Sequence, residues 1–489
     1  MAVILAIDAG TTNLKVGLVD ESCRLLASAS QPMRVHGGAD GRSEQNPQEL
    51  WEAVVGLSRK VLAGWRPDCI VLSTYQFGLL AVDERMRPLG GISLLSDTRA
   101  RQTFADFLRE FDAAELYERT GCPALFQYAL ARCFYLKQRE PELWKRAALF
   151  FGSKDYLVWM LTGEVAAEQS VAAATQMKRL TKAEWDAEIL ERLGLSEKNL
   201  PRIVSGTARS FALSSQAAKC LGVPAGLPVL PGYYDAGAMV CGMGALGRKG
   251  AGVINAGTSA MLRCAGTTPL LDKSAERRLQ PYALEENLFL NGGGVNNAGL
   301  VIDWWRGKFH GADLSGWEFS RLQADAKDVF AFPYLTGERD SLVGPDASGC
   351  LIGLRPWHTA EVVQFALWES VVFSLRMVYE ALSAGGASPD VFYLAGGCSK
   401  SELFNRLLCG ALGKPVRVMG DGEAGLVGCG LLGLAHMGFG NVETLSTKAS
   451  ENVTREYLPE KETTDRLEDK YNRFRKLLVE MPSVYRVSR

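Results

Sequence analysis

Two short stretches of the sequence combine a glycine with neighbouring hydroxyl side chains. One is Ala6-Ile7-Asp8-Ala9-Gly10-Thr11-Thr12-Asn13, and the other is Val253-Ile254-Asn255-Ala256-Gly257-Thr258-Ser259-Ala260. Glycine allows a positive φ and a close approach of backbone N–H groups to a ligand, and threonine adds hydroxyl donors, so each turn suits phosphate oxygens. Either stretch alone could equally be a plain hairpin. Two copies in one chain favour phosphate binding, because together they can hold a polyphosphate from both sides.

The two stretches differ at one charged position, where Asp8 in the first corresponds to Asn255 in the second. A single carboxylate suits a hydrated Mg²⁺ shared with a nucleotide, because Mg²⁺ keeps several waters and takes few protein ligands. We therefore expect Asp8 to hold a metal ion or its waters, although an aspartate here could also only cap the turn. The expected phosphate-binding residues are Gly10, Thr11 and Thr12 in the first stretch, Lys15 just after it, and Gly257 and Thr258 in the second stretch.

A third candidate is Asp235, which follows the apolar stretch Val229–Tyr234, predicted to be a strand, and precedes Ala236-Gly237-Ala238. Its small neighbours leave room for a ligand, and a carboxylate there can accept a proton from a hydroxyl that attacks phosphorus. The chain has four histidines, and none stands in a paired or metal-ligand spacing, so an aspartate is the better candidate for a general base. The alternative is that Asp235 caps the N-terminus of a helix.

The elements that position the first stretch are predicted from apolar periodicity. Apolar runs broken by turn residues predict strands at Val3–Asp8, Lys15–Asp20, Arg24–Ser30 and Cys69–Ser73. A helical period covers Gln48–Ala63, and the segment Phe104–Gly163 is also mainly helical in period. Strands and helices therefore alternate in the first half of the chain.

The second half repeats this alternation. Glu361–Leu382 is a long helical pattern, and Val391–Leu394 and Val416–Met419 are predicted strands. Between the strands, Ala395-Gly396-Gly397-Cys398 predicts a glycine turn, and Ser399 and Glu402 have the spacing of a capping box before the next helix. Because the two hydroxyl-rich turns lie half a chain apart, we predict duplicated α/β lobes at residues 1–245 and 246–489, with the turns facing each other across a cleft.

Composition limits the classes of function. A chain of 489 residues is too long for one hydrophobic core, and 54 Lys and Arg against 55 Asp and Glu give a net charge of −1. A protein with so little net charge has no overall electrostatic attraction for nucleic acid or for an anionic membrane, so we expect neither as a partner. Eleven cysteines without a Cys-x-x-Cys spacing indicate reduced thiols. Without a basic leader, and with the apolar stretch Ala424–Met437 too short to span a bilayer, the sequence predicts a cytoplasmic protein.

In their order along the chain, these residues resemble the FGGY carbohydrate kinases, within the actin-like (ribonuclease H-like) ATPase superfamily. The resemblance covers nearly the whole chain. The motifs that carry it are Ile7–Thr12, Asp155-Tyr156-Leu157 with Leu161–Glu164, Asp235, Gly257-Thr258-Ser259, Pro333–Arg339 and Gly396–Ser401.

The resemblance implies two ribonuclease H-like lobes with a central cleft, and ATP-dependent phosphorylation, with Mg²⁺, of a hydroxyl of a sugar, sugar acid or polyol. Asp235 matches the family's catalytic base, and the turns at Gly10 and Gly257 match its two phosphate motifs. Gly396 and Gly397 match the adenosine motif, with Asn405 on the helix behind it. By analogy with the family, the resemblance also suggests a homodimer.

The departures from the family pattern lie among the expected substrate-binding residues Gln76, Phe77, Asp97 and Arg99. Gln76-Phe77 stands where many xylulose and gluconate kinases carry Met-His, and Leu95 replaces a Trp before Asp97-Thr98-Arg99. The segment Gly292–Gly299 looks more like the gluconate kinase branch, so a gluconate-like acid or a ketopentose such as xylulose is favoured. Arg99 could pair with a sugar-acid carboxylate or with a neighbouring acid of the chain.

Two other classes of function remain open from the sequence. An actin-like ATPase motor or chaperone would share the phosphate turns, but it would not need Asp235 placed for a hydroxyl acceptor. A non-catalytic sugar sensor fits the altered Gln76-Phe77 and Leu95. Phosphorylation of an added sugar separates the kinase from both alternatives.

Overall fold

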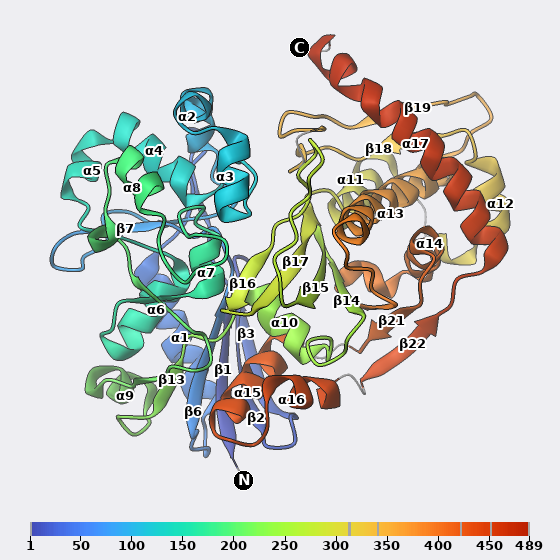
Figure 1. The fold of residues 1–489 in the computed structure, drawn as a ribbon. Helices are drawn as coiled ribbons and strands as arrows, with labels where there is room; N and C mark the ends of the chain where they lie inside the picture. Colours follow the sequence, from blue (N-terminus) through green and yellow to red (C-terminus); the bar gives the residue numbers. More distant parts are fainter. Residues whose placement is uncertain (1, 312–313, 340–341, 421–422, 450–451, 488–489) are drawn as a thin grey trace.

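The computed structural model describes residues 2–311, 314–339, 342–420, 423–449 and 452–487 (Figure 1). Two β-sheets form the centres of two lobes. The first sheet has the order β12 (Phe211–Ala212), β13 (Pro228–Leu230), β6 (Cys69–Thr74), β1 (Val3–Ala9), β2 (Asn13–Asp20) and β3 (Leu25–Pro32). β1 pairs antiparallel with β2 and parallel with β6. Nearly all side chains of β1 are buried, as expected for a strand covered on both faces.

The second sheet repeats the strand arrangement of the first and has one more strand, β16, at its edge. Its order is β16 (Tyr282–Glu285), β17 (Leu288–Val295), β15 (Ala260–Gly266), β14 (Ala251–Ala256), β20 (Val391–Ala395), β21 (Val416–Met419) and β22 (Val453–Tyr457). β14 pairs antiparallel with β15 and parallel with β20, as β1 does with β2 and β6. The corresponding edge strands, β12 in the first sheet and β22 in the second, each run antiparallel to their neighbour. This shared order supports a duplication.

Helices surround both sheets. In the first half they are α1 (Pro47–Val61), α2 (Phe104–Glu110), α3 (Ala113–Thr120), α4 (Ala129–Arg139), α5 (Pro141–Arg146), α6 (Ser153–Thr162), α7 (Gln169–Ala173), α8 (Ala187–Leu193), α9 (Ser215–Leu221) and α10 (Asp235–Gly242). In the second half they are α11 (Gly299–Phe309), α12 (Phe319–Asp325), α13 (Ala360–Ala384), α14 (Glu402–Leu412), α15 (Ala424–His436), α16 (Val442–Ala449) and α17 (Lys461–Val487).

Short strands complete the structure. They are β4 (His36–Gly37), β5 (Ser43–Gln45), β7 (Leu80–Val82), β8 (Ile92–Ser93), β9 (Leu149–Phe151), β10 (Ala166–Glu168), β11 (Arg202–Val204), β18 (Phe330–Phe332) and β19 (Cys350–Ile352).

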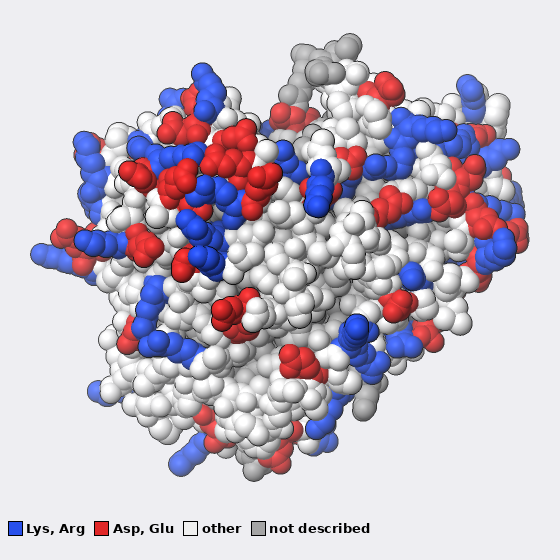
Figure 2. All heavy atoms as spheres, in the orientation of Figure 1, with Lys and Arg blue, Asp and Glu red and all other residues white. Residues whose placement is uncertain are grey.

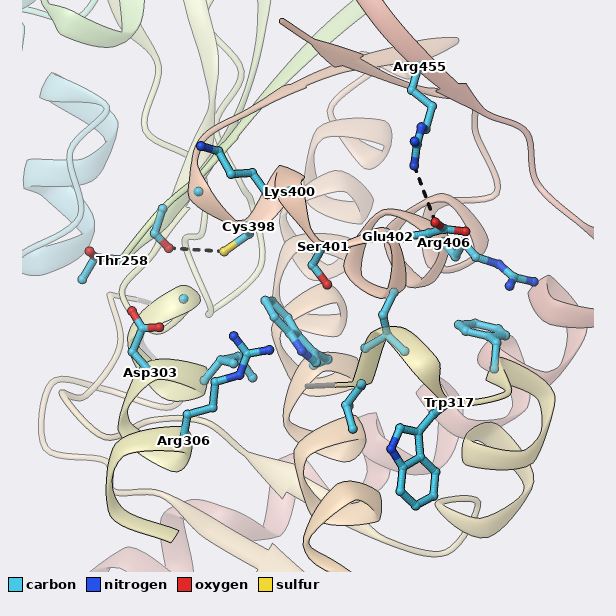
Figure 3. A pocket seen from close by; sticks show the side chains of 18 residues that line it. Thr258, Asp303, Arg306, Trp317, Cys398, Lys400, Ser401, Glu402, Arg406 and Arg455 are labelled. Atoms are coloured by element: carbon cyan, nitrogen blue, oxygen red, sulfur yellow. Dashed lines mark hydrogen bonds and ion pairs between the residues drawn. The ribbon is translucent and has the colours of Figure 1, made fainter. Parts of the chain in front are cut away.

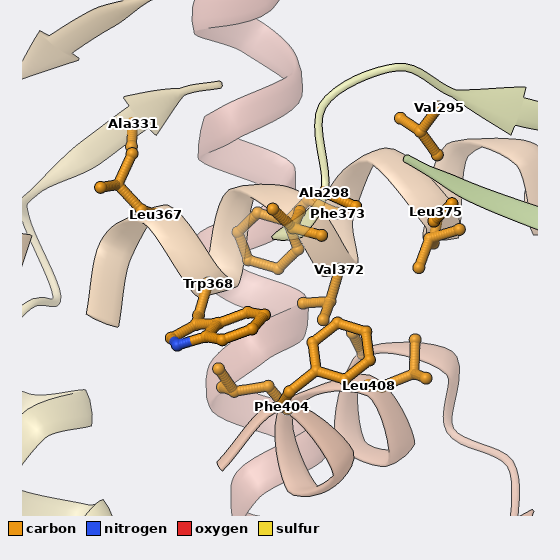
Figure 4. Close-up of a cluster of buried hydrophobic side chains, with 14 of the residues drawn as sticks. Val295, Ala298, Ala331, Leu367, Trp368, Val372, Phe373, Leu375, Phe404 and Leu408 are labelled. Atoms are coloured by element: carbon orange, nitrogen blue, oxygen red, sulfur yellow. The ribbon is translucent and has the colours of Figure 1, made fainter. Parts of the chain in front are cut away.

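The core of the second lobe forms around α13. Trp368 and Phe373 of this helix pack with Phe404 and Leu408 of α14 (Figure 4). α13 is also the one helix among the described residues that is long and apolar enough to cross a membrane, but 89% of its apolar window is buried inside the protein. Its apolar character is therefore explained by packing in the core.

The two halves of the chain are interwoven at α15. This helix belongs to the second half, yet it packs on β1, β2 and β6 of the first sheet (Figure 1). A Cβ at Gly430 would lie 2.4 Å from Cγ1 of Val19, and one at Gly428 would lie 1.8 Å from the carbonyl oxygen of Ala238 on α10. Glycine is required at these positions because the helix axis lies so close to its neighbours. A boundary near residue 245 divides the sequence, but α15 returns to the first lobe.

Several strand predictions are confirmed to within one residue, including Val3–Asp8, Cys69–Ser73 and Val416–Met419. The strand predicted at Val229–Tyr234 is wrong beyond Leu230. Gly232 adopts φ +61, and a Cβ there would lie 2.1 Å from the carbonyl oxygen of Leu72, so the chain turns instead of extending. Asp235 is consequently the first residue of α10.

The capping box predicted at Ser399 is also wrong. The N-cap of α14 is Ser401, whose hydroxyl accepts a hydrogen bond from the N–H of Phe404, and the Ser399 hydroxyl donates to the carbonyl of Gly396. A single turn of 3₁₀ helix at Gly397–Lys400 moves the start of α14 along the chain.

The cysteines and the surface charges agree with what the sequence composition predicts. All eleven cysteines are free, and most are buried. Figure 2 shows acidic and basic side chains interspersed over the face drawn, without a dominant patch of either sign. This pattern agrees with the balanced charge of the sequence.

Candidate active site

The first hydroxyl-rich turn joins β1 to β2. Ala9 pairs with Leu14, and the N–H of Gly10 donates to the carbonyl of Asn13 at 3.0 Å. The Gln45 side-chain amide donates to the carbonyl of Thr11 at 2.8 Å and holds the turn from outside. Thr12 is exposed, and Gly10 and Thr11 are half-buried. The turn therefore presents backbone and hydroxyl groups at the surface of a fixed frame.

The second turn joins β14 to β15 and is one residue shorter. Ala256 pairs with Ala260, and the N–H of Gly257 donates to the carbonyl of Ser259 at 2.9 Å. The start of α11 holds this turn, because the N–H groups of Ala298 and Leu300 donate to the carbonyl of Thr258. Thr258 itself is exposed.

Neither turn glycine adopts a positive φ, so that part of the prediction is wrong. Gly10 is instead required by a close approach, since a Cβ there would lie 2.7 Å from the carbonyl oxygen of Asn13. A Cβ at Gly257 would meet its first neighbour at 3.9 Å, the carbonyl oxygen of Ser259. Gly257 thus leaves open space over the turn, which suits a ligand that contacts backbone.

Asp8 lies at the end of β1, half-buried beside the N-terminus of α15. A Cβ at Gly425 would lie 2.8 Å from Oδ2 of Asp8, and Oδ1 of Asp8 is buried without a hydrogen-bond partner. Burial raises the pKa of this carboxyl, the nearby charge of Glu423 raises it further, and the Ser73 hydroxyl and Lys15 lower it. An unpartnered carboxylate oxygen in this place fits a hydrated cation. In the part of the chain that the structure describes, no cluster of three or more His, Cys, Asp or Glu side chains is placed to hold a metal ion.

Asp235 opens α10, where the first lobe meets the second. Its pKa is raised to about 6, first by burial and then by the negative charge of Asp8, while Lys154 and Arg263 lower it. The interaction with Asp8 shows that the structure brings these two predicted residues together. Its preceding residue, Tyr234, contacts Tyr282 of the second lobe with ring centroids 5.8 Å apart. A carboxyl with this pKa can accept a proton near neutral pH.

A cavity of about 790 Å³ lies in the second lobe beside the second turn. Figure 3 shows Asp303 and Arg306 of α11 on one wall and Cys398, Lys400 and Ser401 on the opposite wall. The other lining residues are Gly257, Thr258, Gly299, Ile302, Leu314, Trp317, Phe319, Trp368, Gly397, Glu402, Leu403, Arg406 and Arg455. Four basic side chains against two acidic ones, together with aromatic walls, suit a ligand that carries both phosphates and a ring.

Gly396 and Gly397 connect this cavity to the second turn. Gly396 adopts φ +95, and a Cβ there would lie 2.5 Å from the carbonyl oxygen of Ala256. Asn405 does not line the cavity. It is buried, and its Nδ2 donates to the carbonyl of Ser399 at 2.8 Å, so it holds the turn from behind.

Gln76 and Phe77 follow β6. Gln76 is buried, and its Nε2 donates to the carbonyl of Ser170 at 3.0 Å. Phe77 adopts φ +68, a strained conformation for a residue with a side chain, and its ring lies 5.1 Å from that of Tyr128. The guanidinium of Arg132 donates to the carbonyl of Phe77 and holds this conformation.

Arg99 is surrounded by acids of the chain. Its guanidinium pairs with Asp97, Glu44 and Glu140, and both Asp97 and Arg99 are buried. A sugar-acid carboxylate would have to displace one of these partners. Of the two alternatives left open by the sequence, the geometry favours a structural ion pair.

Lys15 is also paired. Its Nζ lies 2.6 Å from Oε2 of Glu423, the residue before α15, and both side chains are about one-third exposed, at 37% and 36%. This contact ties the first hairpin to the second half of the chain. A phosphate that reached Lys15 would compete with Glu423.

Three residues of the site were not predicted from the sequence. Lys154, Glu168 and Ser170 form a buried hydrogen-bonded group beside Asp235. Lys154 directly precedes Asp155 in one of the family motifs. The sequence around it does not indicate that its partner is Glu168, because Glu168 lies on another element.

Comparisons with known proteins agree with this arrangement. Residues 3–242 match the N-terminal domain of the FGGY family of carbohydrate kinases, and residues 252–437 match its C-terminal domain. The chain is 28% identical over 453 residues to a gluconokinase of Bacillus licheniformis, covering 88% of this chain and 87% of that protein. It is 25% identical over 471 residues to a xylulose kinase of Bacillus subtilis (strain 168), covering 93% and 91%.

The fold has the same relatives. The structure of a ligand-bound xylulose kinase from Lactobacillus acidophilus superposes with a TM-score of 0.93 and 23% identity, over 100% of both chains. Three observations agree. The two sheets share six strands in the same arrangement, an acid pair lies beside the first turn, and the family matches cover both halves of the chain. The chain belongs to the FGGY family of carbohydrate kinases, with two ribonuclease H-like lobes.

Proposed function

We propose that this carbohydrate kinase transfers a phosphoryl group from ATP to a hydroxyl of a sugar, sugar acid or polyol, with Asp235 as the general base. The observation that carries the proposal is Asp235 at the start of α10, beside Asp8, with a pKa raised to about 6. A base is most effective when its pKa lies near the working pH, because it is then ionised and still able to bind a proton.

In this proposal the second lobe binds the nucleotide, and the first lobe supplies the metal ligand and the base. The cavity beside Thr258 and Gly397 has the size and charge to hold a nucleotide. Asp8 offers one unpartnered carboxylate oxygen to Mg²⁺. When bound, ATP supplies the phosphoryl group and Mg²⁺ neutralises part of its charge. Asp235 accepts the proton of the attacking hydroxyl, which makes that oxygen a better nucleophile.

For the acceptor we propose a gluconate-like acid or a ketopentose such as xylulose. Similarity to gluconokinases and xylulose kinases supports both. Among the predicted substrate residues, Arg99 already has three acidic partners. Arg132, which lies beside the predicted residue Phe77, donates to the backbone carbonyls of Phe77 and Leu94. This geometry favours a neutral acceptor, because neither cation is free to pair with a carboxylate.

The test is a coupled ADP-release assay with Mg-ATP over pentuloses, hexonates, polyols and deoxysugars. We expect one acceptor to stimulate ADP release, and the phosphorylated sugar should be detected by mass spectrometry. Specific sugar binding without ADP release would instead identify a sensor. ADP release that no sugar alters would point to a motor-type ATPase.

A further inference from the structure

The start of α11 holds the second hydroxyl-rich turn through three backbone hydrogen bonds. The N–H of Gly299 donates to the carbonyl of Gly257 at 2.8 Å. The N–H groups of Ala298 and Leu300 donate to the carbonyl of Thr258, at 3.2 and 3.1 Å. The two segments lie so close that a Cβ at Gly299 would be 2.7 Å from the carbonyl oxygen of Gly257. The segment at the start of α11 therefore fixes two peptide units of the turn.

These hydrogen bonds determine where the N–H groups of the turn point. In a planar trans peptide the N–H points opposite to the C=O. Because the carbonyls of Gly257 and Thr258 point to α11, the N–H groups of Thr258 and Ser259 point away from it. Within the described residues, neither of these N–H groups donates to another group of the chain. Two successive N–H groups of a turn that are free in this way suit a phosphate oxygen.

One buried side chain, that of Asn297, holds the start of α11 in place. Asn297 is 0% exposed. Its Nδ2 donates to the carbonyl of Gly337 at 2.8 Å, and its Oδ1 accepts from the N–H and from the hydroxyl of Thr336, both at 3.1 Å. The amide has one favourable orientation, because turning it over would place donor against donor and acceptor against acceptor. Asn297 therefore ties the start of α11 to the loop Thr336–Arg339.

The neighbouring residue, Asn296, adds to this connection. Its N–H donates to the two carboxylate oxygens of Glu338 at 3.0 and 3.1 Å, and its Oδ1 accepts from Nε of Arg339 at 2.6 Å. Neither asparagine lines the cavity of the second lobe, and no residue of the loop Thr336–Arg339 does. An effect of Asn297 on a ligand in that cavity is therefore expected to act through the turn.

We propose that Asn297 is a positioning residue for the nucleotide: by joining the loop Thr336–Arg339 to the start of α11, it fixes the carbonyls of the second turn and so directs the N–H groups of Thr258 and Ser259 to a phosphate. The inference rests on the proposed nucleotide site in the second lobe. A change at Asn297 should alter nucleotide binding and leave the binding of the acceptor unaffected, because the predicted acceptor residues lie in the first lobe.

The first test is the affinity of Asn297→Ala for ADP, measured by calorimetry. The variant loses all three side-chain hydrogen bonds, so the start of α11 is less well fixed and the N–H groups of the turn are less well aligned. We expect the Kd for ADP to rise about tenfold, the effect of a weakened hydrogen bond to a charged group. In turnover, KM for ATP should rise while KM for the sugar stays near that of the wild type. A folded Asn297→Ala protein with the wild-type Kd would overturn the proposal.

Thr336→Val serves as a second variant if Asn297→Ala fails to fold. Valine has the shape of threonine but no hydroxyl, so Asn297 loses one of its hydrogen bonds and the Kd for ADP should rise about threefold. Thr336→Ser retains the hydroxyl and should restore the wild-type Kd. Unchanged ADP affinity in Thr336→Val, or an equal loss in Thr336→Ser, would refute the role of Asn297.

Thr336 is itself exposed, so a direct contact with the ligand has to be separated from an effect through Asn297. In the double variant Asn297→Ala with Thr336→Val, the Kd should equal that of Asn297→Ala, because the threonine hydroxyl no longer has this partner to lose. A further threefold rise in the double variant would contradict the connection through Asn297.

The chain offers a matched control in Asn291→Ala. Asn291, on β17, is also a buried amide, 1% exposed, whose Oδ1 accepts from the N–H of Leu270 and whose Nδ2 donates to the carbonyl of Thr268. These partners belong to the loop after β15 and not to α11. Asn291→Ala should lose stability but keep the wild-type Kd for ADP. If it raised the Kd as much as Asn297→Ala, the effect would be one of general destabilisation and the proposal would fail.

A second readout does not require nucleotide binding. In protein labelled with ¹⁵N-threonine, the amide signal that is missing from Thr258→Val identifies Thr258. Without nucleotide, this signal should shift or broaden in Asn297→Ala and stay in place in Asn291→Ala. If the wild type binds no ADP, the proposed nucleotide site fails, while this signal still tests whether Asn297 holds the turn. An unchanged Thr258 signal in Asn297→Ala would refute the positioning role.

Discussion

The two hydroxyl-rich turns occupy equivalent places in the two sheets, yet their surroundings differ. The first lies beside Asp8 and Asp235, two carboxyls whose pKa values are raised by burial. The second carries Asn255 in place of Asp8 and lines the large cavity of the second lobe. The same hairpin turn thus presents carboxylates in the first lobe and neutral hydrogen-bond donors in the second.

This difference indicates how a duplicated turn can be divided between two tasks. A carboxylate near phosphate oxygens is repulsive unless a cation lies between them, so an acid belongs on the side where a metal ion would bind. The neutral turn can approach phosphates directly through its backbone. The following changes break or sharpen this comparison, beginning with the largest expected effect.

Removal of the base should abolish transfer and leave the second turn intact. For Asp235→Ala we expect sugar phosphorylation to fall about 10³-fold, within the range for a lost general base. The affinity for ADP, measured by calorimetry, should stay near that of the wild type because Asp235 does not line the cavity. Undiminished phosphorylation would remove Asp235 from the mechanism.

Exchanging the charged position tests the comparison directly. Asp8→Asn gives the first turn the chemistry of the second, and we expect turnover to fall about 10²-fold with a higher Mg²⁺ requirement. The reciprocal Asn255→Asp should weaken ADP binding about tenfold, because it adds a negative charge beside the Gly396 turn. Mg²⁺ titrations of the rate and calorimetry with ADP measure the two effects. Wild-type Mg²⁺ dependence in Asp8→Asn would contradict the assignment of Asp8.

The contact between Gly396 and the second turn can be broken by one methyl group. In Gly396→Ala, φ +95 is strained and the new Cβ would meet the carbonyl oxygen of Ala256 at 2.5 Å. We expect a loss of about 2 kcal/mol in the free energy of unfolding and about tenfold weaker ADP binding.

Gly386→Ala is the matched control for this variant. Gly386 has φ +96, but nothing lies within 4 Å of a Cβ there. It should cost about 1 kcal/mol from the backbone alone and leave ADP affinity unchanged. Equal effects on ADP binding in both variants would separate Gly396 from the nucleotide site.

The smallest effect is expected at the hydroxyl of Thr258. Thr258→Val keeps the shape and removes the donor, so ADP binding should weaken about fivefold, corresponding to one lost hydrogen bond. Ser259→Ala on the same turn is the control, since Ser259 does not line the cavity. Identical ADP affinities in the two variants would argue against a phosphate contact at Thr258.

Many strands of the two sheets were predictable from the sequence, because apolar strands covered on both faces have a strong sequence signal. The runs at Val3–Asp8 and Cys69–Ser73 are of this kind. The end of the predicted strand at Val229–Tyr234 was missed because the turn at Gly232 depends on the approach of Leu72 from another strand.

The predicted site shows the same limit. Asp8, Asp235 and the turns follow from local motifs, but the partners of Arg99 and Lys15 come from distant segments. The Lys154–Glu168 pair has no local signal either, since a buried lysine is recognised only by the acid that it meets. Contacts between elements decided which polar residues were available to a ligand.

The return of α15 to the first sheet sets an order for biosynthesis. Ile4, Val19 and Val71 are covered by Gly430 and Gly433 of α15, so a ribosome that has made only residues 1–245 exposes this apolar face. A fragment ending at residue 245 would lack that cover and would be prone to aggregate. The first lobe therefore completes its interior only after α15 (Ala424–His436) has been translated.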